Sequence, residues 1–248
     1  MQDYLKADLN RLFHRVPIWI VWALFMVGIT VITVIFSWQE YFNYASLGDE
    51  IELVLSMAVP LLVAFQLNFI FEEDLQAKTM QIVLGRGLER RHLILAKWLE
   101  MAVFVLVDIL SIELLMLGIG VINGVFLKSQ AIMVVLAASL SSGLLVMVMV
   151  SILMIFIYRS LHLGVGQLIF LLLCFRPLSR LAGFLVGKYT WLASINLESF
   201  FPGFNLVNFA EGMKAGTFHG KQLMVVLIYL VLALLLACRC FKKKELDF

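Results

Sequence analysis

Charged residues are scarce in this chain of 248 residues. Asp, Glu, Lys and Arg together make up 15% of it, whereas hydrophobic residues make up 62%, and the mean hydropathy is +1.00. So few charged side chains cannot cover the surface of a soluble globule of this size. The composition therefore excludes an ordinary soluble domain and predicts an integral membrane protein.

Residues that commonly form disulfides, metal sites or nucleophiles are equally sparse. The three cysteines, Cys174, Cys238 and Cys240, are odd in number and lie in or beside apolar runs, which implies no disulfide framework. The four histidines are scattered, and neither an H-E-x-x-H nor a C-x-x-C spacing occurs. We expect no metal site and no catalytic residue.

A phosphate-binding loop of the form G-x-x-x-x-G-K-[ST] is also missing. Gly187-Lys188 is followed by tyrosine, and Gly220-Lys221 is followed by glutamine. We therefore expect no cofactor on this chain and no ATP hydrolysis by it. Any nucleotide chemistry must come from a partner.

One enzyme motif is matched in part. Glu72-Glu73 has the paired glutamates of intramembrane CAAX-type proteases, whose motif is EExxxR. The arginine position is Ala77 here, which argues against a protease.

Long apolar runs are abundant. A helix needs about 20 apolar residues to cross roughly 30 Å of hydrocarbon, and these runs are too long and too uniformly apolar for barrel strands. They predict an all-α integral membrane protein, one domain over residues 1–248 with six transmembrane helices. The predicted spans cover residues 16–39, 53–71, 98–127, 129–158, 162–186 and 222–238.

The basic residues predict the orientation. Six spans place both termini on one side, and that side holds 13 of the 19 basic residues, an excess typical of cytoplasmic loops. We expect both termini to be cytoplasmic in a multi-pass protein of the plasma membrane. The 13 are Lys6, Arg11, Arg15, Lys78, Arg86, Arg90, Arg91, Lys97, Arg159, Arg239, Lys242, Lys243 and Lys244.

The first 16 residues have the pattern of an amphipathic helix. Leu5, Leu9, Leu12 and Phe13 recur at helical spacing beside basic residues. Such a helix should lie along the cytoplasmic surface of the bilayer. A plain positively charged anchor is the alternative.

Residues 72–97 form a charged segment between two apolar runs. Gly85 and Gly87 should break the chain, and residues 88–97 should form a short separate helix with Arg90 and Arg91 facing water. A segment of this length is unusual for a simple connection between adjacent spans, although a solvated connector remains the alternative.

With these features the sequence resembles the permeases of ABC-2 type transporters. The resemblance covers most of the chain: an amphipathic N-terminal helix, six spans, a charged loop between spans two and three, and a long outer hairpin before span six. The family tends to show an acidic residue after span two, then Gly-Thr, a leucine-rich stretch, Arg, and Lys at the start of span three. Lys78 stands at the glycine position.

This resemblance implies that residues 72–97 are a coupling helix that docks on a separate ATP-binding cassette subunit. The implied partners are ATPase subunits carrying ATP and Mg, a second identical or different permease chain, and the lipid bilayer, with no nucleic acid. The matching positions are Glu72, Glu73, Thr79, Arg90, Arg91 and Lys97.

Charged residues inside the predicted spans need partners, because a bare charge in hydrocarbon is costly. Glu100 should stay near the cytoplasmic interface, and Glu113 should lie deep enough to meet Arg176 or Arg180. Asp108 falls near the membrane centre. It either lines a path at a dimer interface or makes a buried structural hydrogen bond.

Span five should break at Pro177, since proline removes a backbone hydrogen bond. The semi-apolar residues 176–220 then suit a re-entrant hairpin at the outer interface, with its turn at Pro202-Gly203. The small residues 137–143, AASLSSG, predict a close helix contact in span four.

These features predict a permease subunit of an ATP-driven exporter, with an antimicrobial peptide or drug as the substrate class in a resistance or immunity system. The rival interpretation is a membrane scaffold or sensor whose cytoplasmic loop docks a different partner.

Overall fold

The computed structural model describes residues 2–38, 47–72, 83–85, 87–123, 129–160, 163–174, 201–217 and 219–243, and all regular structure there is helical. Among these residues, five helices are long and apolar enough to cross a membrane. The chain is thus an all-α, multi-pass membrane protein. Its helices are α1 (Gln2–Phe13), α2 (Val16–Trp38), α3 (Leu47–Leu67), the π-helix η1 (Asn68–Glu72), α6 (Arg90–Ile122), α7 (Ser129–Ser160), α8 (Gly164–Cys174), α11 (Pro202–Lys214) and α12 (Gly220–Lys243).

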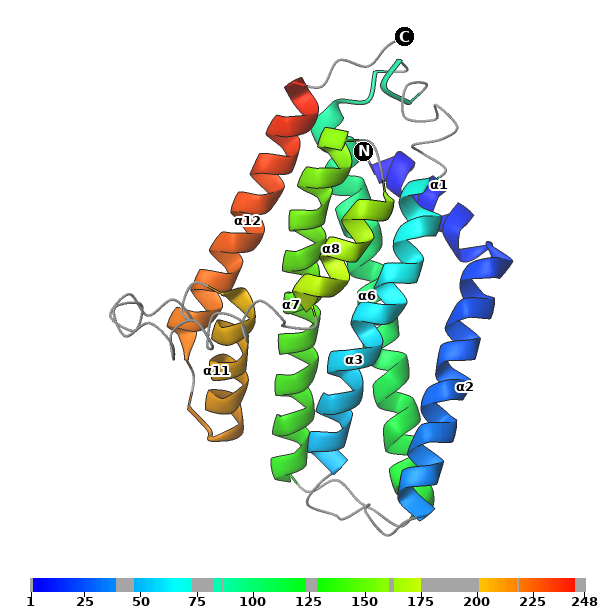
Figure 1. Ribbon diagram of the computed structural model, residues 1–248, viewed down its shortest axis with the longest axis vertical. Helices are drawn as coiled ribbons and strands as arrows, with labels where there is room; N and C mark the ends of the chain where they lie inside the picture. The colour runs from blue at the N-terminus through cyan, green and yellow to red at the C-terminus, as the bar shows by residue number, and fades with distance from the viewer. Residues whose placement is uncertain are drawn as a thin grey trace.

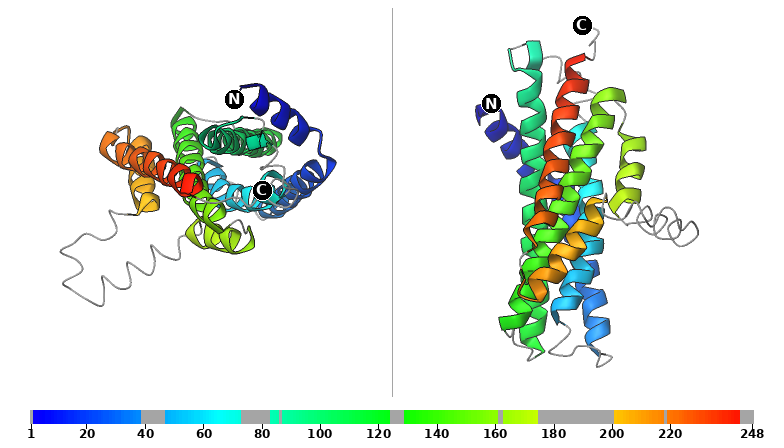
Figure 2. Two further views of the ribbon diagram at one scale, coloured as in Figure 1. Left: turned by 90° about the horizontal axis from the view of Figure 1, so that it is seen from above. Right: turned by 90° about the vertical axis from the view of Figure 1, so that its left-hand side faces the viewer.

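Helix α7 is the centre of the bundle (Figures 1 and 2). It packs against α3, α6, α8, α11 and α12, whereas α2 lies at the edge and packs on α3 and α6. Helix α1 and the C-terminal part of α12 lie at the same end of the bundle in Figure 1. We call this end, where α6 also begins, the α1 end; the turn between α11 and α12 lies toward the opposite end.

The exposed faces of the long helices are apolar, as bilayer contact requires. On α2 the exposed residues Ile20, Leu24, Val27 and Val31 repeat every three or four positions. This spacing puts them in one stripe along the helix. Lipid rather than water suits such a stripe.

The N-terminal segment folds as predicted from its apolar pattern. Leu12 is fully buried, whereas Lys6 is exposed. The turn into α2 is closed by Trp19, whose indole N–H donates to the Phe13 carbonyl at 2.7 Å. Figure 2 shows α1 crossing the end of the bundle instead of running parallel to the spans.

Helix α6 corrects the prediction for residues 88–97. It begins at Arg90 and runs without interruption to Ile122, so these residues are not a separate short helix. Leu93 and Ile94 are buried and no helix breaker follows Leu88. Gly87, at φ 92°, supplies the predicted chain break just before the helix.

The later part of the chain agrees with the predictions only in part. Helix α8 has 11 residues, or about 16 Å, which is too short to cross the hydrocarbon. Most of the predicted first limb of the hairpin, residues 175–200, lies outside the described residues. Pro202-Gly203 is not a turn: it begins α11, where proline is favoured in the first turn, and the turn instead contains Ala215 and Gly216.

Span four has the close contact predicted from its small residues. Ala137 and Ala138 are fully buried. A methyl group added at Gly143 would lie 3.1 Å from the Ile109 side chain of α6. The absence of a side chain at Gly143 therefore lets α7 and α6 approach closely.

Candidate functional site

A buried charge cluster joins α1 to the beginning of α6. It consists of Asp8 and Arg11 on α1 with Lys97 and Glu100 on α6. Lys97 donates to Asp8 and lies 3.1 Å from a Glu100 carboxylate oxygen, and Arg11 lies 2.5 Å from Asp8. Lys97 is 2% exposed and Glu100 is fully buried. We call these four residues the Asp8 cluster.

The charge of Asp8 is set by two opposing effects. Burial alone would raise the pKa of this carboxyl, but the Lys97 ammonium, assisted by Arg11, lowers the pKa below its usual 3.8. Asp8 is therefore ionised at neutral pH. Its attraction to Lys97 acts in a dry environment, where charge interactions are strong.

Sequence reasoning missed Asp8. A signal was present, because Asp8 stands three residues after Leu5 and four before Leu12, on the apolar stripe of α1. An acid on such a stripe needs a buried partner. The partner, Lys97, was predicted as the end of the coupling loop, and Glu100 was predicted near the interface without a specific contact.

Arg90 joins α6 to the C-terminal end of α12, contrary to the prediction that it faces water. Its guanidinium donates to the carbonyls of Phe241 at 2.8 Å and Lys242 at 3.2 Å, and it lies 5.4 Å from the centre of the Phe241 ring. The last carbonyls of a helix have no intrahelical donor. Arg90 supplies one and so binds the two helix ends together.

Three aromatic side chains continue this contact into the bundle. Phe241 packs on Tyr158 of α7 with ring centres 4.7 Å apart, and Tyr158 meets Phe71 of η1 at 6.3 Å. All three are buried. We call Phe71, Tyr158 and Phe241 the aromatic cluster; it lies between the end of η1 and the beginning of α6.

Arg91 is exposed, as predicted, and pairs with Glu89. Arg91 lies outside the core. Its hydrogen bond to Glu89 and its positive charge lower the pKa of the exposed Glu89 carboxyl below its usual range. Glu89 is the N-cap residue of α6, but its side chain makes no capping hydrogen bond. Glu89 and Arg91 are thus exposed, whereas Arg90 of the same turn contacts α12.

The other predicted coupling residues are described only in part. Glu72 is the last residue of η1. Glu73 and Thr79 lie outside the described residues, as do Arg176 and Arg180. The expected pairing of Glu113 with these arginines therefore stays a prediction. In the described part of the chain, Glu113 accepts a hydrogen bond from Ser139 of α7.

Asp108 lies inside the bundle, with no exposed surface. The Gln66 side chain of α3 donates to one of its oxygens at 3.0 Å. Of the two alternatives for Asp108, the buried structural hydrogen bond agrees with this geometry. Gln66 was not anticipated, because an uncharged glutamine gives no strong signal in an apolar run.

A second polar contact holds α8 against α3. Gln167 donates to the Asn68 side chain at 2.7 Å and to the Ala64 carbonyl at 3.0 Å. Asn68 begins the π-helix, and π-helical turns often occur at functional sites. Arg15 also donates to the Phe69 carbonyl in this turn, at 3.3 Å.

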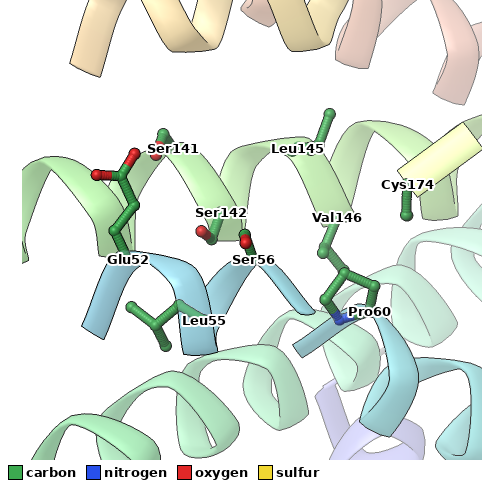
Figure 3. Close-up of a pocket in the computed structure, with 9 residues that line it drawn as sticks. All are labelled: Glu52, Leu55, Ser56, Pro60, Ser141, Ser142, Leu145, Val146 and Cys174. Atoms are coloured by element: carbon green, nitrogen blue, oxygen red, sulfur yellow. The ribbon is translucent and has the colours of Figure 1, made fainter. Parts of the chain in front are cut away.

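A narrow cleft lies between α3, α7 and α8 (Figure 3). Figure 3 shows Ser56 and Ser142 at its middle, with Glu52 at one end and Cys174 at the other. Its free volume is about 30 Å³, enough for about one water. Pro60 also lines it and leaves the Ser56 carbonyl without the usual i+4 donor. The cleft is too small for a drug or peptide.

A larger groove lies at the α1 end, between the beginning of α6 and the end of α12. Its volume is about 640 Å³, within the range of small-molecule sites. We call it the basic groove, because four of its six lining residues are basic. The lining residues are Glu89, Arg90, Arg91, Cys238, Arg239 and Lys242.

The described residues contain no cluster of His, Cys, Asp and Glu able to hold a metal ion. Comparison of the sequence with protein-family models and with curated proteins found no match. The fold therefore defines only a broad class: a multi-pass membrane protein with at least five helices able to span the bilayer.

Proposed function

We propose that this chain is the membrane subunit of an ATP-driven ABC exporter of the plasma membrane. Two such permease chains would work with two separate ATP-binding cassette subunits, which bind ATP and Mg. Residues 72–97 dock on the ATPase from the cytoplasm, where both termini also lie. Antimicrobial peptides or drugs are the proposed substrate class, which would make the protein a resistance or immunity factor.

The observation that carries this proposal is the attachment of the charged segment to the bundle at both of its ends. Phe71 of η1 is itself part of the aromatic cluster, and Arg90 at the beginning of α6 contacts the Phe241 ring of the same cluster. The segment between them is thus tied to η1, α6, α7 and α12 together. A force applied to it acts on several spans at once, as coupling requires.

The continuity of α6 supports the same proposal. Because α6 is unbroken from Arg90 to Ile122, movement of its first turn moves the whole helix. The Asp8 cluster attaches α1 to this helix at Lys97, about two turns after Arg90. A solvated connector would have no need for these attachments.

The test is a pull-down of the proposed ATP-binding cassette subunit with purified permease in detergent. In the variant, Glu89→Arg is combined with Arg91→Glu, which preserves the local ion pair and the net charge. It reverses the charge pattern offered to a partner, so ATPase binding and transport should fall together. Arg90 is left unchanged because it holds α12.

The matched control is a second reversed pair, Glu52→Lys with Lys214→Glu. These residues pair with each other at α3 and α11, away from the α1 end. This control should keep full ATPase binding. If the Glu89/Arg91 variant remains monodisperse and binds ATPase as the unaltered chain does, the segment is only a connector and the proposal is wrong.

A further inference from the structure

The basic groove adjoins a lipid-facing surface. On α12 the exposed apolar residues Ile228, Leu232 and Leu235 are followed by exposed Arg239 and Lys242. The spacing alternates between four and three residues, so all five share one helix face. The apolar stripe that meets acyl chains therefore leads directly into the groove.

The groove favours an anion. Arg90 is engaged by the α12 carbonyls and Arg91 by Glu89, which leaves the exposed Arg239 and Lys242 as the cations best placed for a ligand. The first turn of α6 also favours an anion, because the Glu89 side chain makes no capping hydrogen bond to the backbone N–H groups of this turn. The N-terminus of a long helix attracts anions through its backbone N–H groups.

We propose that the basic groove binds the phosphate headgroup of an anionic phospholipid, with the acyl chains along the Ile228–Leu235 face of α12. The two features call for one ligand with an anionic head and apolar tails. Basic pockets at the cytoplasmic ends of spanning helices suit such headgroups. The long stems of Arg239 and Lys242 reach from the apolar face to the headgroup level. This inference does not depend on the proposed transport function.

The experiment measures lipid bound to the full chain by native mass spectrometry in detergent. The probes are dioleoylphosphatidylglycerol, dioleoylphosphatidylcholine and inorganic phosphate at equal concentrations. We expect a retained phosphatidylglycerol adduct and much weaker retention of phosphatidylcholine. Equal retention of the two lipids would overturn the proposal, and protection of the site by inorganic phosphate alone would identify it as a free-anion site instead.

The variant is Arg239→Gln with Lys242→Gln, both on the exposed face of α12. Each basic side chain near an anionic lipid contributes about fivefold in affinity, so the double variant should bind phosphatidylglycerol about 25-fold more weakly. The control removes two exposed charges elsewhere, at Lys6 and Lys221, and should keep the affinity. Undiminished binding by the Arg239/Lys242 variant would refute the assignment of the site.

An acidic protein surface is the competing occupant of the basic groove. If the Arg239/Lys242 variant keeps phosphatidylglycerol but no longer binds the ATPase in the pull-down described above, the groove is a protein contact and the lipid proposal is wrong. If lipid binding falls and ATPase binding persists, the lipid proposal holds whatever the outcome for the Glu89/Arg91 variant.

Discussion

Replacing Lys97 by methionine tests the Asp8 cluster. The substitution keeps an unbranched side chain of similar length and removes the charge that lies between two buried carboxylates. Asp8 would keep the partly exposed Arg11 and the Tyr4 hydroxyl at 3.4 Å. Glu100 would lose its ion-pair partner among the described residues. Breaking a buried charge pair in this way costs about 3–5 kcal/mol.

The partners of Lys97 should be less sensitive, in a fixed order. Asp8→Asn leaves Lys97 paired with Glu100 at 3.1 Å, so we expect a loss of about 1–3 kcal/mol. Arg11→Gln should cost less than about 1 kcal/mol, because the Arg11 side chain is 34% exposed. Neutralising Asp8, Lys97 and Glu100 together should recover most of the loss caused by Lys97→Met.

The assay is equilibrium unfolding in mixed micelles with tryptophan fluorescence, repeated over pH. Because the pKa of Asp8 is lowered in the folded state, its contribution is complete above about pH 3.8, declines below that, and vanishes under the folded pKa. The part of the acid-dependent loss of stability that Asp8 causes should be missing in Asp8→Asn. A Lys97→Met protein as stable as the unaltered chain would refute the reasoning.

Three further outcomes are expected. Gln66→Leu should destabilise the fold by about 1–3 kcal/mol, because it leaves the buried Asp108 carboxylate without the amide that donates to it. Asp108→Asn keeps an acceptor for Gln66 and should cost less. Unfolding titrations measure both variants. Gly212→Ala should destabilise the turn between α11 and α12 by about 1–3 kcal/mol in the same assay, since its methyl group would lie 2.9 Å from a backbone oxygen. In a cysteine-free background, cysteine at Gly216 should react with an impermeant reagent on intact cells, and cysteine at Gly87 should not.

Each of these outcomes has a control or a contrary result. Gly118→Ala is the control for Gly212, because open space surrounds it and alanine favours a helix. If Gln66→Leu is no less stable than Asp108→Asn, the hydrogen bond is unimportant. Labelling at Gly87 from outside would reverse the orientation inferred from the basic residues.

Five of the six predicted spans correspond to helices long and apolar enough to cross a membrane, because hydrophobic length alone identifies such helices. Helix α2 begins at Val16 as expected, and α7 begins at Ser129. The predicted start of span three, residue 98, lies eight residues after the start of α6, because the charged residues before it are typical of a loop. Nothing in residues 90–97 breaks a helix, however, and Arg90 and Lys97 find partners in neighbouring helices.

The partners of the buried polar groups were harder to predict. Lys97 and Glu100 are three residues apart on one helix, so their proximity follows from helix geometry. The contacts of Asp8 with Lys97 and of Gln66 with Asp108 join residues 89 and 42 positions apart. They depend on how α1 and α3 pack against α6, which no local pattern specifies.

The length of α6 makes it a lever. Its 33 residues extend about 50 Å, well beyond the hydrocarbon thickness of about 30 Å. If the Asp8 cluster at Lys97 acts as the fulcrum, the short arm to Arg90 is about 10 Å and the long arm to Ile122 is about 38 Å. A displacement of the first turn would then be magnified almost fourfold, in the opposite direction, at the far side of the membrane.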